Sequence, residues 1–195
     1  PPKGDLISML AHGEATRNMD RMEYLGNLIL LIVGGNDTTR NTISSSVYSL
    51  NKNPEQYAKL RANHDLVLPM VSETIRWQTP LAHMRRNATQ DVELGGKTIK
   101  KGDKVIMWYL SGNRDETAIP NANQFIIDRP RARQHLSFGF GIHQCAGLSL
   151  ARLEGRVAIG RFLQRFPNYQ LTQAPLRGGR ARFRGFLQAP FNTGR

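Results

Sequence analysis

The sequence predicts a mainly α-helical chain that carries a small antiparallel β region. Two stretches, residues 22–51 and the residues from Leu148 onward, place apolar side chains at helical spacing. Between them, residues 81–109 have a shorter period, and two turn signals, Gly95-Gly96 and Lys101-Gly102-Asp103, divide them into strand-length pieces. Long helical stretches on both sides of a group of short strands indicate this fold class.

The first long helix is expected over residues 22–51, after a stretch, 1–17, with only weak helical periodicity. Because residues 28–33 are apolar on nearly all sides, we expect the centre of this helix to be buried. Gly34-Gly35 and Asp37-Thr38-Thr39 then interrupt the apolar run. By pattern alone they favour two helices, the first ended by the glycines and the second capped by Asp37.

Two shorter helices are expected next. Asn53-Pro54-Glu55 predicts a helix start, because a capping residue is followed by proline in the first turn, and this helix runs to about residue 62. A second helix begins at Asp65. Glu73 and Arg76 lie on one face of it at i,i+3 spacing, and by pattern alone they form a surface ion pair.

The β region is expected to form one small antiparallel sheet from residues 81–109. His83 and Arg85 alternate to the same side of its first strand, where pattern alone leaves them as ordinary exposed residues or as binding residues. Residues 113–134 are rich in Asn, Pro and Arg and predict an irregular meander.

The single cysteine, Cys145, lies in a glycine-rich loop just before the helix that starts at Leu148. A helix N-terminus favours the thiolate form, which is a metal ligand or a nucleophile. His143, two residues away, is poorly spaced to serve as the base that a nucleophile needs. Zinc and iron–sulfur sites require further ligands, whereas one axial thiolate suits haem iron. A buried structural cysteine is the alternative.

Three blocks carry a family resemblance. Phe138-x-x-Gly141-x-His143-x-Cys145-x-Gly147 resembles the haem-binding loop of the cytochrome P-450 monooxygenases. Glu73-Thr74-Ile75-Arg76 resembles the Glu-x-x-Arg helix of that family, and residues 34–39 resemble its oxygen-activating helix, in the family's order. Residues 75–86 and 111–115 are similar to the soluble bacterial members that hydroxylate terminal carbons of alkanes.

The resemblance implies the C-terminal portion of the cytochrome P-450 fold, since members are about twice this long. On this interpretation the chain is a partial sequence. Residues 1–170 are the C-terminal part of a haem-thiolate monooxygenase domain. Residues 171–195 are a divergent tail rich in arginine and glycine. In the family this region forms strands and a loop, whereas the sequence also leaves disorder or a sequencing or cloning artefact open.

The resemblance also assigns roles. The implied cofactor is haem b (iron protoporphyrin IX), with Cys145 as its axial ligand. Asp37 and Thr38 would supply protons for O₂ activation, in a helix that can open locally. Glu73 and Arg76 would be buried and joined by Arg129 in a structural cluster. The remaining cofactor-binding candidates are His83, Arg85 and His143 toward the propionates, with His135 as a weaker one, and Phe138, Gly139 and Gly147 in the loop.

The charge is unevenly distributed along the chain. Residues 1–128 hold 15 basic and 14 acidic residues, whereas residues 129–195 hold 12 arginines and one acidic residue, Glu154. A basic patch indicates an acidic partner. Nucleic acid is one possibility. We favour an acidic ferredoxin, with its NAD(P)H-dependent reductase, because the basic segment surrounds the proposed thiolate and, in the family, faces the electron donor.

The function implied is a monooxygenase that uses O₂ to hydroxylate an unactivated C–H bond of a small apolar substrate, at the terminal carbon of a medium-chain alkane or fatty acid. Three alternatives stay open: a haem-binding sensor or carrier, a basic nucleic-acid-binding module, and an inactive partial chain. The longest apolar run, residues 28–33, is far shorter than the ~20 residues that span a bilayer. With one cysteine and no visible signal peptide, we expect a cytoplasmic protein.

Overall fold

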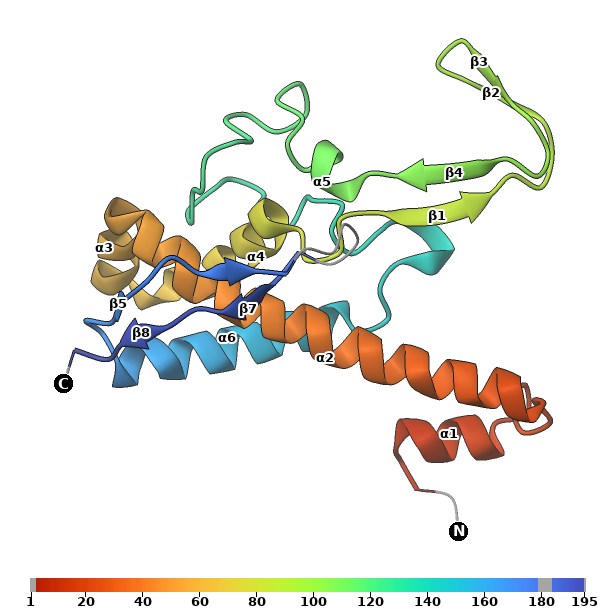
Figure 1. Cartoon of the computed structure of the whole chain (residues 1–195), viewed down its shortest axis with the longest axis horizontal. Coiled ribbons are helices and arrows are strands. Elements are labelled where there is room, and N and C mark those ends of the chain that lie inside the picture. Colours follow the sequence, from red (N-terminus) through yellow and green to blue (C-terminus); the bar gives the residue numbers. More distant parts are fainter. Residues whose placement is uncertain (1–2, 179–183, 195) are drawn as a thin grey trace. The chain divides into compact units, whose positions relative to one another are not determined.

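The computed structural model describes residues 3–178 and 184–194, which are mainly helical with small antiparallel sheets, as the sequence predicts (Figure 1). The chain divides into two compact units, Pro1–Thr38 and Thr39–Arg195. The boundary falls inside helix α2 (Arg21–Lys52), which contributes to both units.

Side-chain caps begin both helices of the first unit. The Asp5 carboxylate caps α1 (Leu6–His12) by accepting the Ser8 N–H at 2.8 Å. Asp20 precedes α2 and accepts two N–H groups of its first turn, at 2.7 and 3.0 Å. Each carboxylate therefore satisfies helix donors that have no partner within the helix itself.

The centre of α2 is exposed, so the prediction that it is buried is wrong for this chain. Leu30 and Ile32 are 68% and 66% exposed. A helix that is apolar on nearly all sides needs neighbours on every side. The first unit offers only α1 and a short connection, which are too small to enclose it.

Helix α2 runs without a break through Gly34-Gly35 and Asp37-Thr38-Thr39. The alternative of two separate helices is therefore wrong, and the helix has no local opening at these residues. The Thr38 hydroxyl donates to the Gly34 carbonyl one turn earlier, at 2.9 Å. This bond is compatible with regular helix, in which serine and threonine often bond back to position i−4.

Four helices build the core of the second unit: the C-terminal part of α2, α3 (Pro54–Ala62), α4 (Val67–Gln78) and α6 (Leu148–Arg165). α4 and α6 pack closely, because a Cβ added at Gly155 would lie only 2.7 Å from Val71 Cγ1. The helices and the irregular segment 113–134 together supply the fully buried aliphatic side chains, which include Leu50, Leu60, Met70, Ile127 and Ile159.

The predicted starts of α3 and α4 are close to the observed ones, although the capping differs. Asn53 precedes α3, but its amide donates back to the Ser49 carbonyl at 2.7 Å and so closes α2. A single 3-10 turn, η1 (His64–Leu66), leads into α4. Its cap is Asn63, whose side chain accepts the Asp65 N–H at 3.0 Å.

The β region consists of two two-stranded ladders rather than the single sheet expected. β1 (Met84–Asn87) pairs with β4 (Lys104–Met107), and β2 (Val92–Leu94) pairs with β3 (Lys97–Ile99), both antiparallel. Gly95 and Gly96 form the turn of the second ladder with φ of +57° and +73°, a region that favours glycine. After β4 the chain enters a short helix, α5 (Tyr109–Gly112).

Strands are also present near the C-terminus. β5 (Gln170–Leu171) pairs with β8 (Phe191–Asn192), and β6 (Leu176–Arg177) pairs with β7 (Phe186–Gln188). The centre of the arginine- and glycine-rich stretch, residues 179–183, and the last residue lie outside the described residues. Within the described part of the chain, no helix is long and apolar enough to cross a membrane.

Candidate functional site

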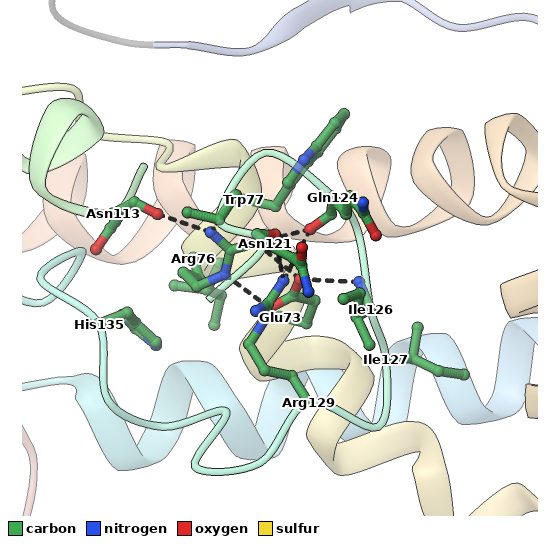
Figure 2. A network of polar contacts seen from close by, with 12 residues as sticks. Glu73, Arg76, Trp77, Asn113, Asn121, Gln124, Ile126, Ile127, Arg129 and His135 are labelled. Carbon is green, nitrogen blue, oxygen red and sulfur yellow. Dashed lines mark hydrogen bonds and ion pairs between the residues drawn. The ribbon is translucent and has the colours of Figure 1, made fainter. Parts of the chain in front are cut away.

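Glu73, Arg76 and Arg129 meet at the buried side of α4 (Figure 2). The Glu73 carboxylate accepts from Arg76 Nε at 2.7 Å and from Arg76 Nη2 at 2.8 Å. Arg129 Nε donates to the same carboxylate at 3.1 Å, and so does the Ile126 N–H at 2.9 Å. The structure therefore brings together all three members of the expected cluster, with exposed fractions of 0%, 1% and 8%.

The remaining guanidinium donors hold the irregular segment 113–134, which loops around the cluster in Figure 2. Arg76 donates to backbone carbonyls at 2.7–3.0 Å, and Arg129 donates to an overlapping set. The carbonyls that receive these bonds belong to Asn113, Pro120, Asn121, Ala122 and Gln124. A segment without regular structure is thus fixed by charge-assisted bonds from two buried arginines.

The glycine-rich loop carries Cys145 in front of α6. Gly139 and Gly141 have φ of +69° and +76°, which turns the chain into a 3-10 turn, η2 (Gly141–His143). The Cys145 N–H donates back to the Phe138 carbonyl at 2.8 Å. Gly147 is the N-cap residue of α6, so Cys145 lies just before a helix N-terminus, as predicted. Cys145 is free and is exposed in this chain, not buried in its core.

Phe138 anchors the start of this loop. Its ring packs against the core, and the Arg152 guanidinium lies 5.2 Å above it. The His135 ring also contacts it, at 5.5 Å between ring centroids. Burial, reinforced by the Arg152 and Arg76 charges, lowers the His135 pKa to about 4, so we expect this imidazole to be neutral near pH 7.

The propionate candidates come from two places. His83 lies just outside β1, not in it as expected, and its ring meets Trp108 edge-on at 4.7 Å. Arg85 lies on β1 opposite Ile106 and is exposed, and His143 is exposed in η2. Among the described residues, no hydrogen bond or ion pair joins these three side chains. His83 Nδ1 is buried and has no hydrogen-bond partner in that part of the chain.

Asp37 and Thr38 belong to the first unit, whereas Cys145 belongs to the second. The next residue, Thr39, lies in the second unit and donates from Oγ1 to Glu154 Oε2 of α6 at 3.1 Å. Sequence reasoning missed this contact between α2 and α6. No sequence pattern links these two residues, which are 115 positions apart.

The family model for cytochrome P450 matches residues 3–177. The chain belongs to the cytochrome P450 family. Members of this family carry a haem held through a cysteine thiolate and use O₂ and a redox partner.

Solved structures and curated relatives agree with this assignment. Cytochrome P450-153 from Novosphingobium aromaticivorans is 47% identical with a TM-score of 0.91, covering 97% of this chain and 48% of that one. CYP153D17 from Sphingomonas sp. PAMC 26605 is 51% identical with a TM-score of 0.91, covering 98% and 48%. Linalool 8-monooxygenase of Pseudomonas putida is 40% identical over 87% of this chain and 42% of its own length. The chain thus spans less than half the length of these relatives.

The residues around Cys145 fit a haem. The sulfur is exposed, and the neighbouring Phe140 and Ile142 are 88% and 99% exposed, which offers apolar surface to a flat porphyrin ring. The unpartnered Nδ1 of His83 and the exposed guanidinium of Arg85 suit carboxylate groups. Within the described ranges, no three His, Cys, Asp or Glu side chains could together hold a metal ion.

Proposed function

We propose that this chain is the C-terminal part of a longer haem-thiolate monooxygenase that hydroxylates an unactivated C–H bond. The observation that carries the proposal is the exposed Cys145 on a glycine-rich loop before α6, in a chain that belongs to the cytochrome P450 family. One oxygen atom of O₂ enters the C–H bond and the other leaves as water, with two electrons and two protons consumed. Haem b, bound through Cys145, supplies the O₂ activation.

The chain's own residues bind and orient the cofactor. Cys145 provides the thiolate, and Phe138, Gly139 and Gly147 form the loop that presents it. His83, Arg85 and His143 bind the two propionates, since carboxylates need positive or N–H donors. Glu73, Arg76 and Arg129 hold the irregular segment that lies between α5 and the loop.

Asp37 and Thr38 have the task of moving protons to the reacting oxygen. An acid and an alcohol in adjacent positions can pass a proton from solvent to a reacting group, which is general acid catalysis. A haem sensor or carrier has no need of this pair. Thr38→Ala therefore distinguishes a monooxygenase from a haem sensor. In a monooxygenase the substitution should uncouple NAD(P)H consumption from product formation, whereas in a sensor it should change haem binding little.

For the substrate we propose the terminal carbon of a medium-chain alkane or fatty acid. Relatives support this choice by their names: a methyl-branched lipid omega-hydroxylase of Mycobacterium tuberculosis is 40% identical over 89% of the chain. A P450BioI structure, 38% identical, contains hexadec-9Z-enoic acid attached to acyl carrier protein. The first name refers to a lipid and the second to a fatty acid.

For the electron donor we propose a ferredoxin with an NAD(P)H-dependent reductase. Exposed arginines occur both before the loop and on α6, among them Arg131, Arg133, Arg156 and Arg161. A field of this sign steers an acidic protein toward the surface, and salt screens it. Salt-sensitive DNA binding that survives Cys145→Ser would instead favour the nucleic-acid-binding alternative.

The deciding experiment uses the full-length protein that contains this chain. We expect the reduced, CO-bound protein to show the red-shifted Soret band of thiolate ligation, and we expect this band to vanish in Cys145→Ser. With ferredoxin, reductase and NAD(P)H, the protein should convert octane to 1-octanol. The absence of the thiolate-type band in the unsubstituted protein would refute the proposal.

A further inference from the structure

Asn113 follows α5 and is completely buried, although asparagine is usually a surface residue. Its side chain makes three hydrogen bonds. Oδ1 accepts the Leu136 N–H at 2.6 Å, and Nδ2 donates to Thr79 Oγ1 at 2.9 Å and to Ser137 Oγ at 2.8 Å. Its backbone carbonyl accepts from Arg76 at 2.7 Å. Asn113 thus connects α4, the buried arginine and the chain that leads to the Cys145 loop.

The two hydroxyl partners fix which way the amide points. Thr79 Oγ1 donates its single proton to the Arg76 carbonyl at 2.7 Å, and Ser137 Oγ donates its own to the Ile75 carbonyl at 2.8 Å. Both hydroxyl oxygens can therefore only accept from Asn113. The amide NH₂ must face them, and Oδ1 must face the Leu136 N–H.

Thr79 is itself held in an unusual conformation. It ends α4 with φ of +47°, in the left-handed region that few non-glycine residues adopt. Its side chain is fully buried, and its hydroxyl both donates one hydrogen bond and accepts one. The end of α4 is therefore a rigid support for the Asn113 amide.

Leu136 and Ser137, which are hydrogen-bonded to Asn113, lead directly into the Cys145 loop, and Leu136 is bonded to its backbone. The Leu136 carbonyl accepts the Gly139 N–H at 2.8 Å, and the Phe138 carbonyl accepts the Cys145 N–H at 2.8 Å. An unbroken series of hydrogen bonds thus runs from the end of α4 through Asn113 to the Cys145 backbone.

We propose that Asn113 is a positioning residue that sets the place of the Cys145 sulfur by tying residues 136–137 to the end of α4. The inference rests on the proposed role of Cys145 as the haem ligand. Residues that orient a metal ligand without touching the metal commonly change metal affinity or activity by about 10–100-fold when they are replaced.

The test is Asn113→Asp in the full-length protein. Aspartate has the same shape and keeps the acceptor for Leu136, but it places an oxygen against two hydroxyl oxygens whose protons are already committed. We expect roughly tenfold faster haem transfer to apomyoglobin. We also expect a smaller fraction of the CO complex to show the thiolate-type Soret band while the far-ultraviolet dichroism stays native. Asn123→Asp is the matched control, because Asn123 is exposed on the same irregular segment.

Ser137→Ala is the second variant: it removes one of the two Nδ2 contacts, together with the hydrogen bond that Ser137 donates to the Ile75 carbonyl. It should shift the same two readouts in the same direction by a smaller factor, and it keeps the test decisive if Asn113→Asp does not fold. The proposal is overturned if a folded Asn113→Asp variant retains haem as the parent does and has an unchanged Soret band. If Asn113→Asp does not fold, the same result in Ser137→Ala overturns it. If the unsubstituted protein lacks the thiolate-type band, the proposed function fails instead, so the two failures are distinguishable.

Discussion

Arg76 binds Glu73 through two parallel hydrogen bonds, Nε to Oε2 at 2.7 Å and Nη2 to Oε1 at 2.8 Å, within one turn of α4. This two-bond geometry is the strong form of the arginine–carboxylate contact. Because the same carboxylate also receives Arg129, one negative charge serves two buried guanidinium groups. Glu73 is therefore the member whose loss leaves the most charge without a partner.

Glu73→Gln should lower the free energy of unfolding by about 3–5 kcal/mol, the range for removing one partner of a buried pair. Equilibrium unfolding of the full-length protein in urea measures this change. The control is Asp128→Asn, which removes the exposed Lys59–Asp128 pair (3.0 Å, side chains 47% and 43% exposed). An exposed pair contributes at most about 1 kcal/mol. Equal losses in the two variants would contradict the structural role of the Glu73 cluster.

His135 predicts a pH dependence of stability. Its folded-state pKa of about 4 lies below the ordinary value of 6.5 because of burial and the nearby Arg152 and Arg76 charges. Between these two values the unfolded chain binds more protons than the folded chain, so the free energy of unfolding falls as the pH drops from 6.5 toward 4. The full pKa shift from 6.5 to about 4 corresponds to a loss of about 3 kcal/mol in the free energy of unfolding once the pH is below both values.

The measurement compares urea unfolding at several pH values for the parent and His135→Asn. Asparagine retains an oxygen that can accept the Ser137 N–H, which now bonds to His135 Nδ1 at 3.3 Å. The stability difference between parent and variant should shift in favour of the variant on acidification. His64→Asn, at an exposed 3-10 turn, is the control. Parallel pH curves for parent and His135→Asn would show that His135 does not contribute.

Gly139 and Gly141 provide a matched pair within the Cys145 loop. Both have positive φ, so alanine at either position should cost about 1–2 kcal/mol in backbone strain. At Gly139 a Cβ would also lie 3.1 Å from the Tyr109 hydroxyl, whereas at Gly141 it would meet nothing within 4 Å. Gly139→Ala should therefore retain haem less well than Gly141→Ala, as measured by transfer to apomyoglobin. Equal haem loss would mean that the Tyr109 contact is unimportant.

The sequence predicted those features whose residues lie close together along the chain. The Cys145 loop and the Glu73–Arg76 spacing are each contained in a short stretch, so their geometry follows from helix periodicity and glycine conformations. Arg129 was expected from the family resemblance, and the structure brings it to Glu73. The Asn113 contacts were not foreseen, because Thr79 and Ser137 lie 34 and 24 residues away. No periodic pattern encodes hydrogen bonds between irregular segments.

The error at the centre of α2 has a different origin. An apolar pattern on all sides of residues 28–33 shows that this part of the helix needs neighbours, but it cannot show which segment supplies them. The split of the β region into two ladders was missed for a similar reason. Gly102 has φ of +92° and turns the chain, but the turn residues alone do not determine which strands pair across them.

Gly155 should be the position on α6 most sensitive to a single added methyl group. It is buried against α4, and its Cβ would lie 2.7 Å from Val71 Cγ1, whereas the Cβ of an alanine at Gly160 would make an ordinary 4.0 Å contact with Val67. Both substitutions gain helix propensity of up to about 1 kcal/mol. Overpacking a tight contact costs about 1–3 kcal/mol. Gly160→Ala should therefore stabilise the protein slightly, and Gly155→Ala should destabilise it.

A double-mutant cycle isolates the cause. Val71→Ala alone leaves a cavity and destabilises the protein, but in the Gly155→Ala background it removes the methyl groups that the new Cβ would strike. The double variant should therefore be more stable than the sum of the two single changes predicts, by about 0.5–3 kcal/mol. Additive effects would show that α4 and α6 move apart to accept the methyl group, and Val71 would then not determine how closely α6 approaches α4.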